Sequence, residues 1–268
     1  MLRSLKDLQG YGVKATNGDL GSVADFLMDD QDWVCRYLVV HTGGYFNERD
    51  VLISPMFFRQ IEWAARLFHL ALTQEKIKDS PDTNTDLPVS RQHERDYYHY
   101  YGYPNYWGSS GIWGVSVPLP PEPPEGIRTS PSLAGEEVKD DVHLRSAKFV
   151  RGYHIEGTDG EIGHIDDFIV DDETWRIRYL VVNTSNWWVG KKVLVSPFWT
   201  TRVSWEESMF HLGLSRAEIR NCPEWNAEAP VNRAYEERLF DYYGRPVYWS
   251  QADESPKAPD HVAPGAHR

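Results

Sequence analysis

The sequence predicts a mainly β protein made of two tandem small antiparallel β-barrels, each followed by short C-terminal helices. Three observations support this prediction: the chain repeats itself, each copy contains about six short strand patterns joined by tight turns, and aromatic residues are abundant. The 268 residues include 11 Trp and 15 Tyr but only 4 Met. Flat aromatic side chains suit a half-buried pleated surface, so this composition favours strands.

The first half of the chain matches the second half when it is shifted by about 142 residues. The match begins with Leu-Arg-Ser at residues 2–4 and 144–146, and it includes Arg-Tyr-Leu-Val-Val at residues 36–40 and 178–182. Roughly 40% of about 106 aligned positions are identical, far above chance for an ungapped comparison. We therefore interpret the chain as an internal duplication.

The duplication defines the predicted domain organisation. The first barrel with its helical tail spans residues 1–107, and the second spans residues 144–249. Residues 108–143 are rich in Pro, Gly and Ser and are expected to form a semi-rigid linker. Residues 250–268 carry almost no large apolar side chain, so we expect a disordered tail there.

Each copy contains hairpin and strand signals in the same order. The dipeptides Asn17-Gly18 and Asp159-Gly160 lie between alternating segments and are typical of type I′ turns, which need positive φ. The most apolar strand follows an acidic turn and is expected to lie centrally in its sheet. In the first copy, the strands expected after the hairpin cover residues 33–42, 51–54, 61–65 and 67–72. Closing them into a small barrel would remove exposed sheet edges.

Two short helices are predicted at the end of each copy. Ser215 and Glu218 have the spacing of a capping box, and Thr73 is the matching cap in the first copy. The second helix has a capping residue at its start and a glycine followed by proline at its end. These start and stop residues are Ser90 and Gly102 in the first copy and Asn232 and Gly244 in the second.

Charge and cysteine content exclude several classes of function. The formal net charge of −12 argues against a nucleic-acid partner, because phosphate binding depends on clustered Lys and Arg. No apolar run approaches the roughly 18 residues of a transmembrane helix, and residues 1–12 lack the apolar stretch of a secretory signal. Cys35 and Cys222 are too few for a disulfide framework or a Cys-rich zinc site. We expect a cytoplasmic protein.

Several segments of the second copy together resemble a known family. They are Gly-Tyr-His-Ile, an Asp-Gly turn, Asp-Asp-Phe-Ile-Val-Asp-Asp, Arg-Ile-Arg-Tyr-Leu-Val-Val, Lys-Lys-Val-Leu-Val-Ser-Pro and Arg-Val-Ser-Trp. This pattern resembles the PRC-barrel family, named for the cytoplasmic barrel of the photosynthetic reaction-centre H subunit. The resemblance covers residues 2–80 and 144–222, and the aromatic tails are similar to those of stand-alone bacterial proteins with two such barrels. It implies a small barrel that binds other proteins as an adaptor or assembly module, without an enzymatic activity.

Acidic residues cluster near one turn of each copy. They are Asp166, Asp167, Asp171, Asp172 and Glu173 in the second copy and Asp25, Asp29, Asp30 and Asp32 in the first. Hard cations bind several oxygen ligands, which makes these residues the candidate metal site. However, strand alternation sends neighbouring carboxylates to opposite faces, and Asp is common in turns because it bonds to the local backbone. We therefore predict no metal ligands.

Two histidines occupy equivalent positions in the copies. His69 and His211 each lie between a Phe and a Leu in a predicted strand, on its less buried face. No Ser or Cys nucleophile with a partnering Asp accompanies them in a recognisable arrangement. A structural role is preferred over a catalytic one, and we predict neither catalytic residues nor a cofactor.

Adjacent aromatic residues supply the one positive indication of function. Tyr45 and Phe46 in the first copy align with Trp187 and Trp188 in the second, in a loop between strands. Two adjacent bulky side chains cannot both face one core, and loops usually lie at the surface. Either another part of the chain covers them or they form a patch that binds a partner. These four residues are the candidate partner-binding site.

The sequence therefore predicts a cytoplasmic, non-enzymatic protein that binds another protein or assists assembly. Two alternatives remain open at this stage. One is a peripheral accessory of a photosynthetic or other membrane electron-transfer complex, associated with the membrane through its partner, an interpretation based on family analogy. The other is a metal-binding protein or enzyme that uses the acidic turns or the paired histidines.

Overall fold

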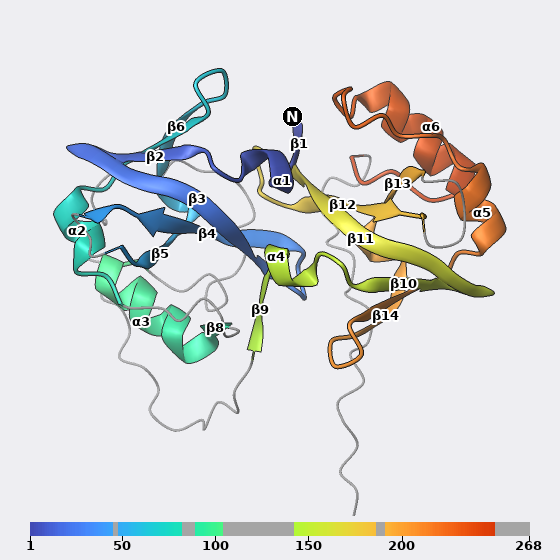
Figure 1. The fold of residues 1–268 in the computed structure, drawn as a ribbon, viewed down its shortest axis with the longest axis horizontal. Coiled ribbons are helices and arrows are strands. Elements are labelled where there is room, and N and C mark those ends of the chain that lie inside the picture. The colour runs from blue at the N-terminus through green and yellow to red at the C-terminus, as the bar shows by residue number, and fades with distance from the viewer. Residues whose placement is uncertain (45–47, 82–88, 104–141, 186–190, 250–268) are drawn as a thin grey trace, which may run out of the picture. The chain divides into compact units, whose positions relative to one another are not determined.

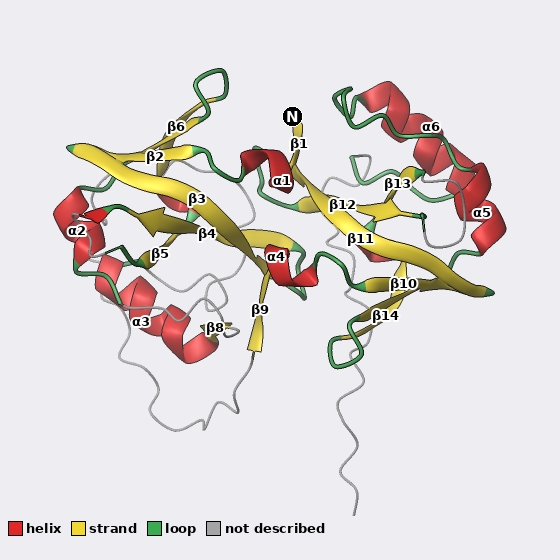
Figure 2. Cartoon of the chain, in the orientation of Figure 1, coloured by secondary structure: helices red, strands yellow, loops and turns green. Residues whose placement is uncertain are grey.

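The structure is a computed structural model that describes residues 1–44, 48–81, 89–103, 142–185 and 191–249. Within these ranges the chain is mainly β, as Figure 2 shows. These ranges contain fifteen strands in two sheets and six α-helices. This confirms the mainly β part of the predicted fold class. The predicted linker lies outside the described residues except for its last two, and the predicted tail lies wholly outside them.

The chain forms two compact units, which we call unit 1 and unit 2. Unit 1 contains residues 1–6, 149–172 and 177–268, and unit 2 contains residues 7–148 and 173–176. Each unit is therefore built mainly from one copy and completed by short segments of the other. The predicted boundaries at residues 1–107 and 144–249 do not coincide with these units.

The sheet of unit 2 has eight strands, and six of them follow the path β5-β4-β3-β2-β7-β6, seen in blue and teal in Figure 1. The long strands β3 and β4 form its centre, as the apolar pattern predicts. The six strands of the path are β2 (Gly12–Ala15), β3 (Gly18–Asp29), β4 (Val34–Thr42), β5 (Asp50–Ile53), β6 (Phe58–Glu62) and β7 (Leu67–Leu70).

The sheet of unit 1 has seven strands and follows the equivalent path, β13-β12-β11-β10-β15-β14. The order of strands is therefore the same in both sheets. The strands of this path are β10 (His154–Gly157), β11 (Gly160–Asp171), β12 (Ile177–Asn183), β13 (Lys192–Val195), β14 (Thr200–Ser204) and β15 (Met209–Leu212).

The expectation of closed antiparallel barrels is corrected in two respects. Each path is open, because its end strands, β5 and β6 or β13 and β14, are joined by a 3₁₀ turn and do not pair with each other. The two turns begin at Pro55 and Pro197, and proline cannot donate to a sheet ladder. Each path also contains one parallel pair, β2 with β7 and β10 with β15.

The first hairpin of each sheet lies where the sequence predicts it, but the predicted type I′ turns are wrong. Ala15 pairs with Gly18, so Thr16 and Asn17 form the turn, and neither Asn17 nor Gly18 has a positive φ. The Asn17 side chain instead accepts a hydrogen bond of 2.8 Å from the backbone N–H of Gln74. The turn residue is therefore used to hold the helix that follows the sheet.

Thr73, Ser215 and Asn232 cap their helices as predicted. Ser90, the predicted start of the second helix of the first copy, instead ends a short strand. Thr73 accepts from the N–H of Lys76 at the start of α2 (Gln74–Lys78), and Ser215 forms a capping box with Glu218 at the start of α5 (Arg216–Asn221). The second helices are α3 (Arg91–Tyr101) and α6 (Arg233–Tyr243). Asn232 caps α6, and Gly244 ends it in the left-handed conformation at φ 59°. None of the helices in the described ranges has the length and apolar character needed to cross a bilayer.

Two short strands complete the sheets with residues from the other copy. Strand β1 (Leu2–Ser4) pairs antiparallel with β11 in unit 1, and strand β9 (Val142–Ser146) pairs antiparallel with β3 in unit 2. Each is followed by one helical turn, α1 (Leu5–Leu8) or α4 (Ala147–Val150). The equivalent Leu-Arg-Ser segments of the two copies are thus exchanged.

A tryptophan from the second copy also completes the core of unit 2. Trp175 is 6% exposed and its ring lies 5.2 Å from that of Phe58 and 6.1 Å from that of Phe68, measured between centroids. Its φ of 57° is uncommon for a bulky residue. The tight turn that imposes this conformation aims the ring into a core built by residues far away in the sequence.

We expect Trp175→Ala to lower the free energy of unfolding of unit 2 by about 3–5 kcal/mol, because it leaves a large cavity beside the buried ring of Phe68 and the half-buried ring of Phe58. Hydrogen exchange should show faster exchange of the amides of β3, β4 and β7, although the substitution lies in the second copy. The half-buried Trp225 of unit 1 supplies the control variant Trp225→Ala. Unchanged protection in unit 2 after Trp175→Ala would contradict this account of its core.

Candidate functional site

The most elaborate polar site in the structure is the edge of β11 that receives strand β1. Leu2, Arg3 and Ser4 lie opposite Asp171, Val170 and Ile169. The backbone N–H of Asp172 extends this ladder by donating to the carbonyl of Met1 over 2.9 Å. The backbone contact alone would accept many sequences, so specificity depends on the side chains.

Three aspartates bind the side chains and the backbone of the segment that contains β1. Arg3 Nε donates to Asp172 Oδ2 over 2.7 Å. The Ser4 hydroxyl donates to Asp167, whose other oxygen accepts from the backbone N–H of Lys6 over 3.0 Å. Lys6 Nζ lies 3.8 Å from Asp166. Charge-assisted bonds of this kind are roughly twice as strong as neutral ones.

The edge of β3 in unit 2 receives β9 through the same contacts. Arg145 Nε donates to Asp30 Oδ2 over 2.9 Å. Ser146 donates to Asp25, and the other oxygen of Asp25 accepts from the backbone N–H of Lys148 over 3.0 Å. The backbone N–H of Asp30 donates to the carbonyl of His143 over 2.9 Å. Both copies therefore bind the Leu-Arg-Ser segment and the backbone N–H two residues after it in the same way. The contact of the Lys6 side chain with Asp166 is specific to unit 1, because Ala24 is the equivalent of Asp166 in unit 2.

A β-bulge lies beside each serine-binding aspartate. The register of β11 with β12 shifts between Ile165 and Asp167, and the register of β3 with β4 shifts between Val23 and Asp25. A bulge bends its strand and re-aims nearby side chains. We infer that these bulges aim the carboxylates of Asp167 and Asp25 towards the docked segment.

Burial raises the pKa of Asp167 above its usual range. The Ser4 hydroxyl and the backbone N–H groups of Phe168 and Lys6 oppose this effect because they favour the ionised form. Two of those three compensating groups belong to the docked segment. Loss of β1 would therefore leave this carboxylate with a single hydrogen-bond donor of its own strand.

A second aspartate of unit 2 is held inside its own turn. Asp29 is 1% exposed and accepts from Arg36 Nε and Nη2, both over 3.2 Å, and from the backbone N–H groups of Gln31 and Asp32. Burial raises the pKa of Asp29, but Arg36 and the two backbone N–H groups outweigh it and hold the pKa below 3.8. Asp171 makes the equivalent contact with Arg178 over 3.1 Å.

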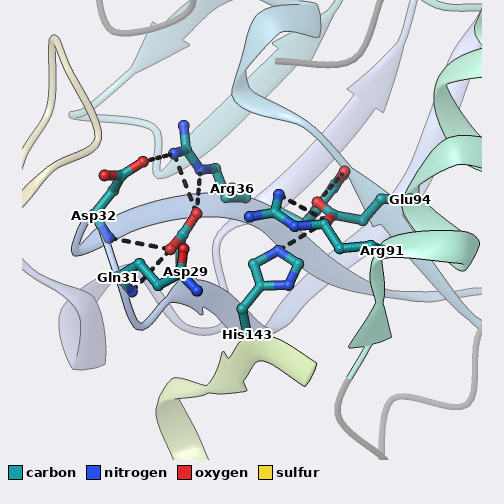
Figure 3. A network of polar contacts seen from close by, with 8 residues as sticks. Asp29, Gln31, Asp32, Arg36, Arg91, Glu94 and His143 are labelled. Atoms are coloured by element: carbon teal, nitrogen blue, oxygen red, sulfur yellow. Dashed lines mark hydrogen bonds and ion pairs between the residues drawn. The ribbon is translucent and has the colours of Figure 1, made fainter. Parts of the chain in front are cut away.

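Unit 2 adds a buried charged cluster that binds β9 through His143, drawn in Figure 3. His143 Nε2 lies 2.9 Å from Glu94 Oε2, and both side chains are 1% exposed. The Tyr37 hydroxyl donates to Glu94 over 3.0 Å, and Arg91 Nη1 lies 3.6 Å from it. The cluster joins the exchanged strand to helix α3. Strand β8 (Val89–Ser90), which precedes this helix, also pairs with β9.

Unit 1 satisfies the equivalent buried glutamate without its exchanged strand. Glu236 on α6 accepts from the hydroxyls of Tyr179 and Tyr248, each over 2.7 Å, and lies 3.3 Å from Arg233 Nη1. Tyr248 takes the role that His143 has in unit 2. The residue equivalent to His143 is Met1, which cannot form an ion pair through its side chain.

The acidic residues considered as metal ligands are engaged with cations and with the exchanged strands. Asp172, Asp167 and Asp166 bind the β1 segment, and Asp30 and Asp25 bind the β9 segment. In the part of the chain that the structure describes, no group of three or more His, Cys, Asp or Glu residues could hold a metal ion. Asp30 and Asp172 lie in the predicted acidic turns, whereas Asp25, Asp166 and Asp167 lie within strands β3 and β11. Their role in binding the exchanged strands was not predicted from the sequence.

The paired histidines make different contacts in the two units. His69 Nε2 lies 2.7 Å from Glu62, whereas His211 Nδ1 lies 3.0 Å from Glu156. These glutamates are not equivalent positions of the repeat. The other candidate residues, Tyr45, Phe46, Trp187 and Trp188, lie outside the described residues, and their role as a partner-binding patch stays a prediction.

Comparison with known proteins shows that part of the chain matches a family model. Residues 150–201 match the family model of the PRC-barrel domain, which confirms the resemblance within the second copy. These residues include β10, β11, β12 and β13, and hence the edge that receives β1. A protein of Deinococcus radiodurans, described as an uncharacterized protein, is 30% identical over 99 residues. That alignment covers 37% of this chain and 34% of the relative, about a third of its length.

We expect His143→Met, which introduces the residue of the equivalent position, to lower the free energy of unfolding of unit 2 by about 3 kcal/mol, because Glu94 loses its buried partner. Urea unfolding gives the size of the change, and hydrogen exchange should show the loss of protection in β8 and β9. His99→Met on the exposed face of α3 is the control. Equal stability of the two variants would show that the buried pair contributes nothing to holding β9.

The lowered pKa of Asp29 predicts a loss of stability in acid. Its contribution is present above the ordinary pKa of 3.8 and is lost as the pH falls through the lower pKa of the folded state. Asp29→Asn should therefore lower stability at pH 7 and flatten its dependence on pH between about pH 5 and pH 2. Urea unfolding across this range measures both effects. If the free energy of unfolding of Asp29→Asn and of the unmodified protein depends on pH in the same way, this prediction is wrong.

Proposed function

We propose that this chain is a non-enzymatic assembly module in which two PRC-type units bind extended segments of proteins by strand addition. The observation that carries the proposal is the pair of edges on β11 and β3, each of which accepts a Leu-Arg-Ser segment that its own copy does not supply. Strand addition obtains affinity from backbone bonds and specificity from alternate side chains. We regard each open sheet as a variant of the PRC barrel.

Two features support a role in binding over a role in catalysis. Burial raises the pKa of the Cys35 thiol and of the Cys222 thiol, which makes both poor nucleophiles. The buried glutamates, Glu94 and Glu236, are engaged with cations and tyrosine hydroxyls that join the tail helices to the sheets. These groups stabilise the fold, and we assign no chemical step to them.

We also propose a cytoplasmic location and a protein partner. Cys35 and Cys222 are unbridged, which fits a reducing compartment, and the net charge of −12 disfavours nucleic acid as the partner. The loop pairs Tyr45-Phe46 and Trp187-Trp188 remain the proposed second contact surface.

Capture from an extract of the native cells tests the function with three baits: the full chain, a chain without residues 1–6, and that shorter chain saturated with a peptide of residues 1–6. A partner that adds a strand should bind the shortened chain best, because the edge of β11 is then vacant. The peptide should displace this partner, and a peptide with Arg3→Glu should not.

A second variant separates the two proposed surfaces. A partner that binds the loops should be retained by all three baits and lost after Trp187→Ser with Trp188→Ser, with an unchanged melting temperature. Either pattern supports a binding module. Retention of no protein by any bait, with all baits folded by circular dichroism, would refute the proposal.

A further inference from the structure

The two exchanged strands are held unequally. Strand β9 lies between β3 and β8, and its His143 pairs with the buried Glu94. Strand β1 pairs only with β11 among the strands in the described ranges. Glu236, the equivalent of the glutamate that binds His143 in unit 2, instead accepts hydrogen bonds from the hydroxyls of Tyr179 and Tyr248. Fewer strand pairings and buried ionic contacts therefore break when β1 leaves the edge of β11 than when β9 leaves the edge of β3.

All the contacts that hold β1 come from a short segment at the start of the chain. The same segment of another chain could form the same contacts. They consist of three opposed residue pairs, the contacts of the terminal ammonium and the carbonyl of Met1 with Asp172, and the bonds of Arg3, Ser4 and Lys6 to aspartates. The segment joins the rest of the chain through α1, a helix of only four residues, followed by Gly10 at φ 77°. A single short turn beside a left-handed glycine can act as a hinge, although Leu5 and Leu8 in this turn are each 1% exposed and have to repack when it opens.

We propose that β1 also docks on the β11 edge of a second copy of this chain, so that two copies assemble by reciprocal exchange of residues 1–6. The inference rests on the proposed function and names the partner as the chain itself. Each edge gains from its partner the same contacts that it otherwise receives from its own chain. The balance between the closed monomer and the exchanged dimer is then set by chain concentration and by the conformation of α1.

A matched pair of charge reversals tests the exchange in the full-length chain. Arg3→Asp places a carboxylate on β1 that Asp172 repels, and Asp172→Arg places a guanidinium on the edge that Arg3 repels. Each single variant therefore disfavours docking of its own β1. In an exchanged pair of the two variants, the introduced carboxylate meets the introduced guanidinium, and the native Arg3 of one chain meets the native Asp172 of the other.

Sedimentation and light scattering of the equimolar mixture should show that most of it converts to a species of twice the 31.0 kDa chain mass, with the melting temperature of unit 1 restored. The double variant Arg3→Asp with Asp172→Arg in one chain is the control, since it restores docking within the chain. It should have the melting temperature and the concentration dependence of the unmodified protein.

The exchange between copies is refuted if the mixture remains two destabilised monomers while the double variant is rescued. In that case β11 recognises β1 only within one chain, and the proposed binding of extended segments is still tested separately by the peptide of residues 1–6. If the double variant is not rescued either, the Arg3–Asp172 contact does not determine docking, and the inference falls for that reason as well.

Discussion

The pairing of a Leu-Arg-Ser segment with an acidic strand edge is the interaction on which both units depend. Asp167 and Asp25 each bind a serine hydroxyl and a backbone N–H that arrive from more than a hundred residues away along the chain. Ordering contacts of such long sequence separation carries a loop-closure cost and slows folding. The sheet of unit 2 obtains its full set of strands only after the start of the second copy, up to Ser146, has been synthesised.

Small sequence differences between the copies determine which sheet each exchanged strand joins. Leu-Arg-Ser is identical in β1 and β9, and the aspartates that bind it are equivalent. The distinguishing residue is His143, which satisfies Glu94 in unit 2, whereas Tyr248 satisfies Glu236 in unit 1. A buried ionic contact of this kind specifies pairing more clearly than it adds stability, because desolvation offsets much of the attraction.

Local features were predictable from the sequence, and the exchange was not. Ser215, Thr73 and Asn232 cap helices as expected, because capping depends on residues three positions apart. The pairing of β1 depends on a choice between two equivalent edges, and an identical Leu-Arg-Ser in both copies carries no information about that choice. The acidic turns were located correctly, but their ligands, Arg3 and Arg145, are remote in the sequence. The open ends of the sheets follow from Pro55 and Pro197, which periodicity alone did not reveal.

Reciprocal exchange has a consequence for the integrity of the chain. A protease that cuts between residues 104 and 141 would separate the two copies covalently, yet each fragment would still hold a strand of the other through the contacts of Arg3 and Arg145. The nicked protein is therefore two interlocked fragments, and gel electrophoresis in detergent would report two bands from a particle that is intact in solution. We therefore expect the two copies to stay associated after a break that would separate an ordinary pair of tandem domains.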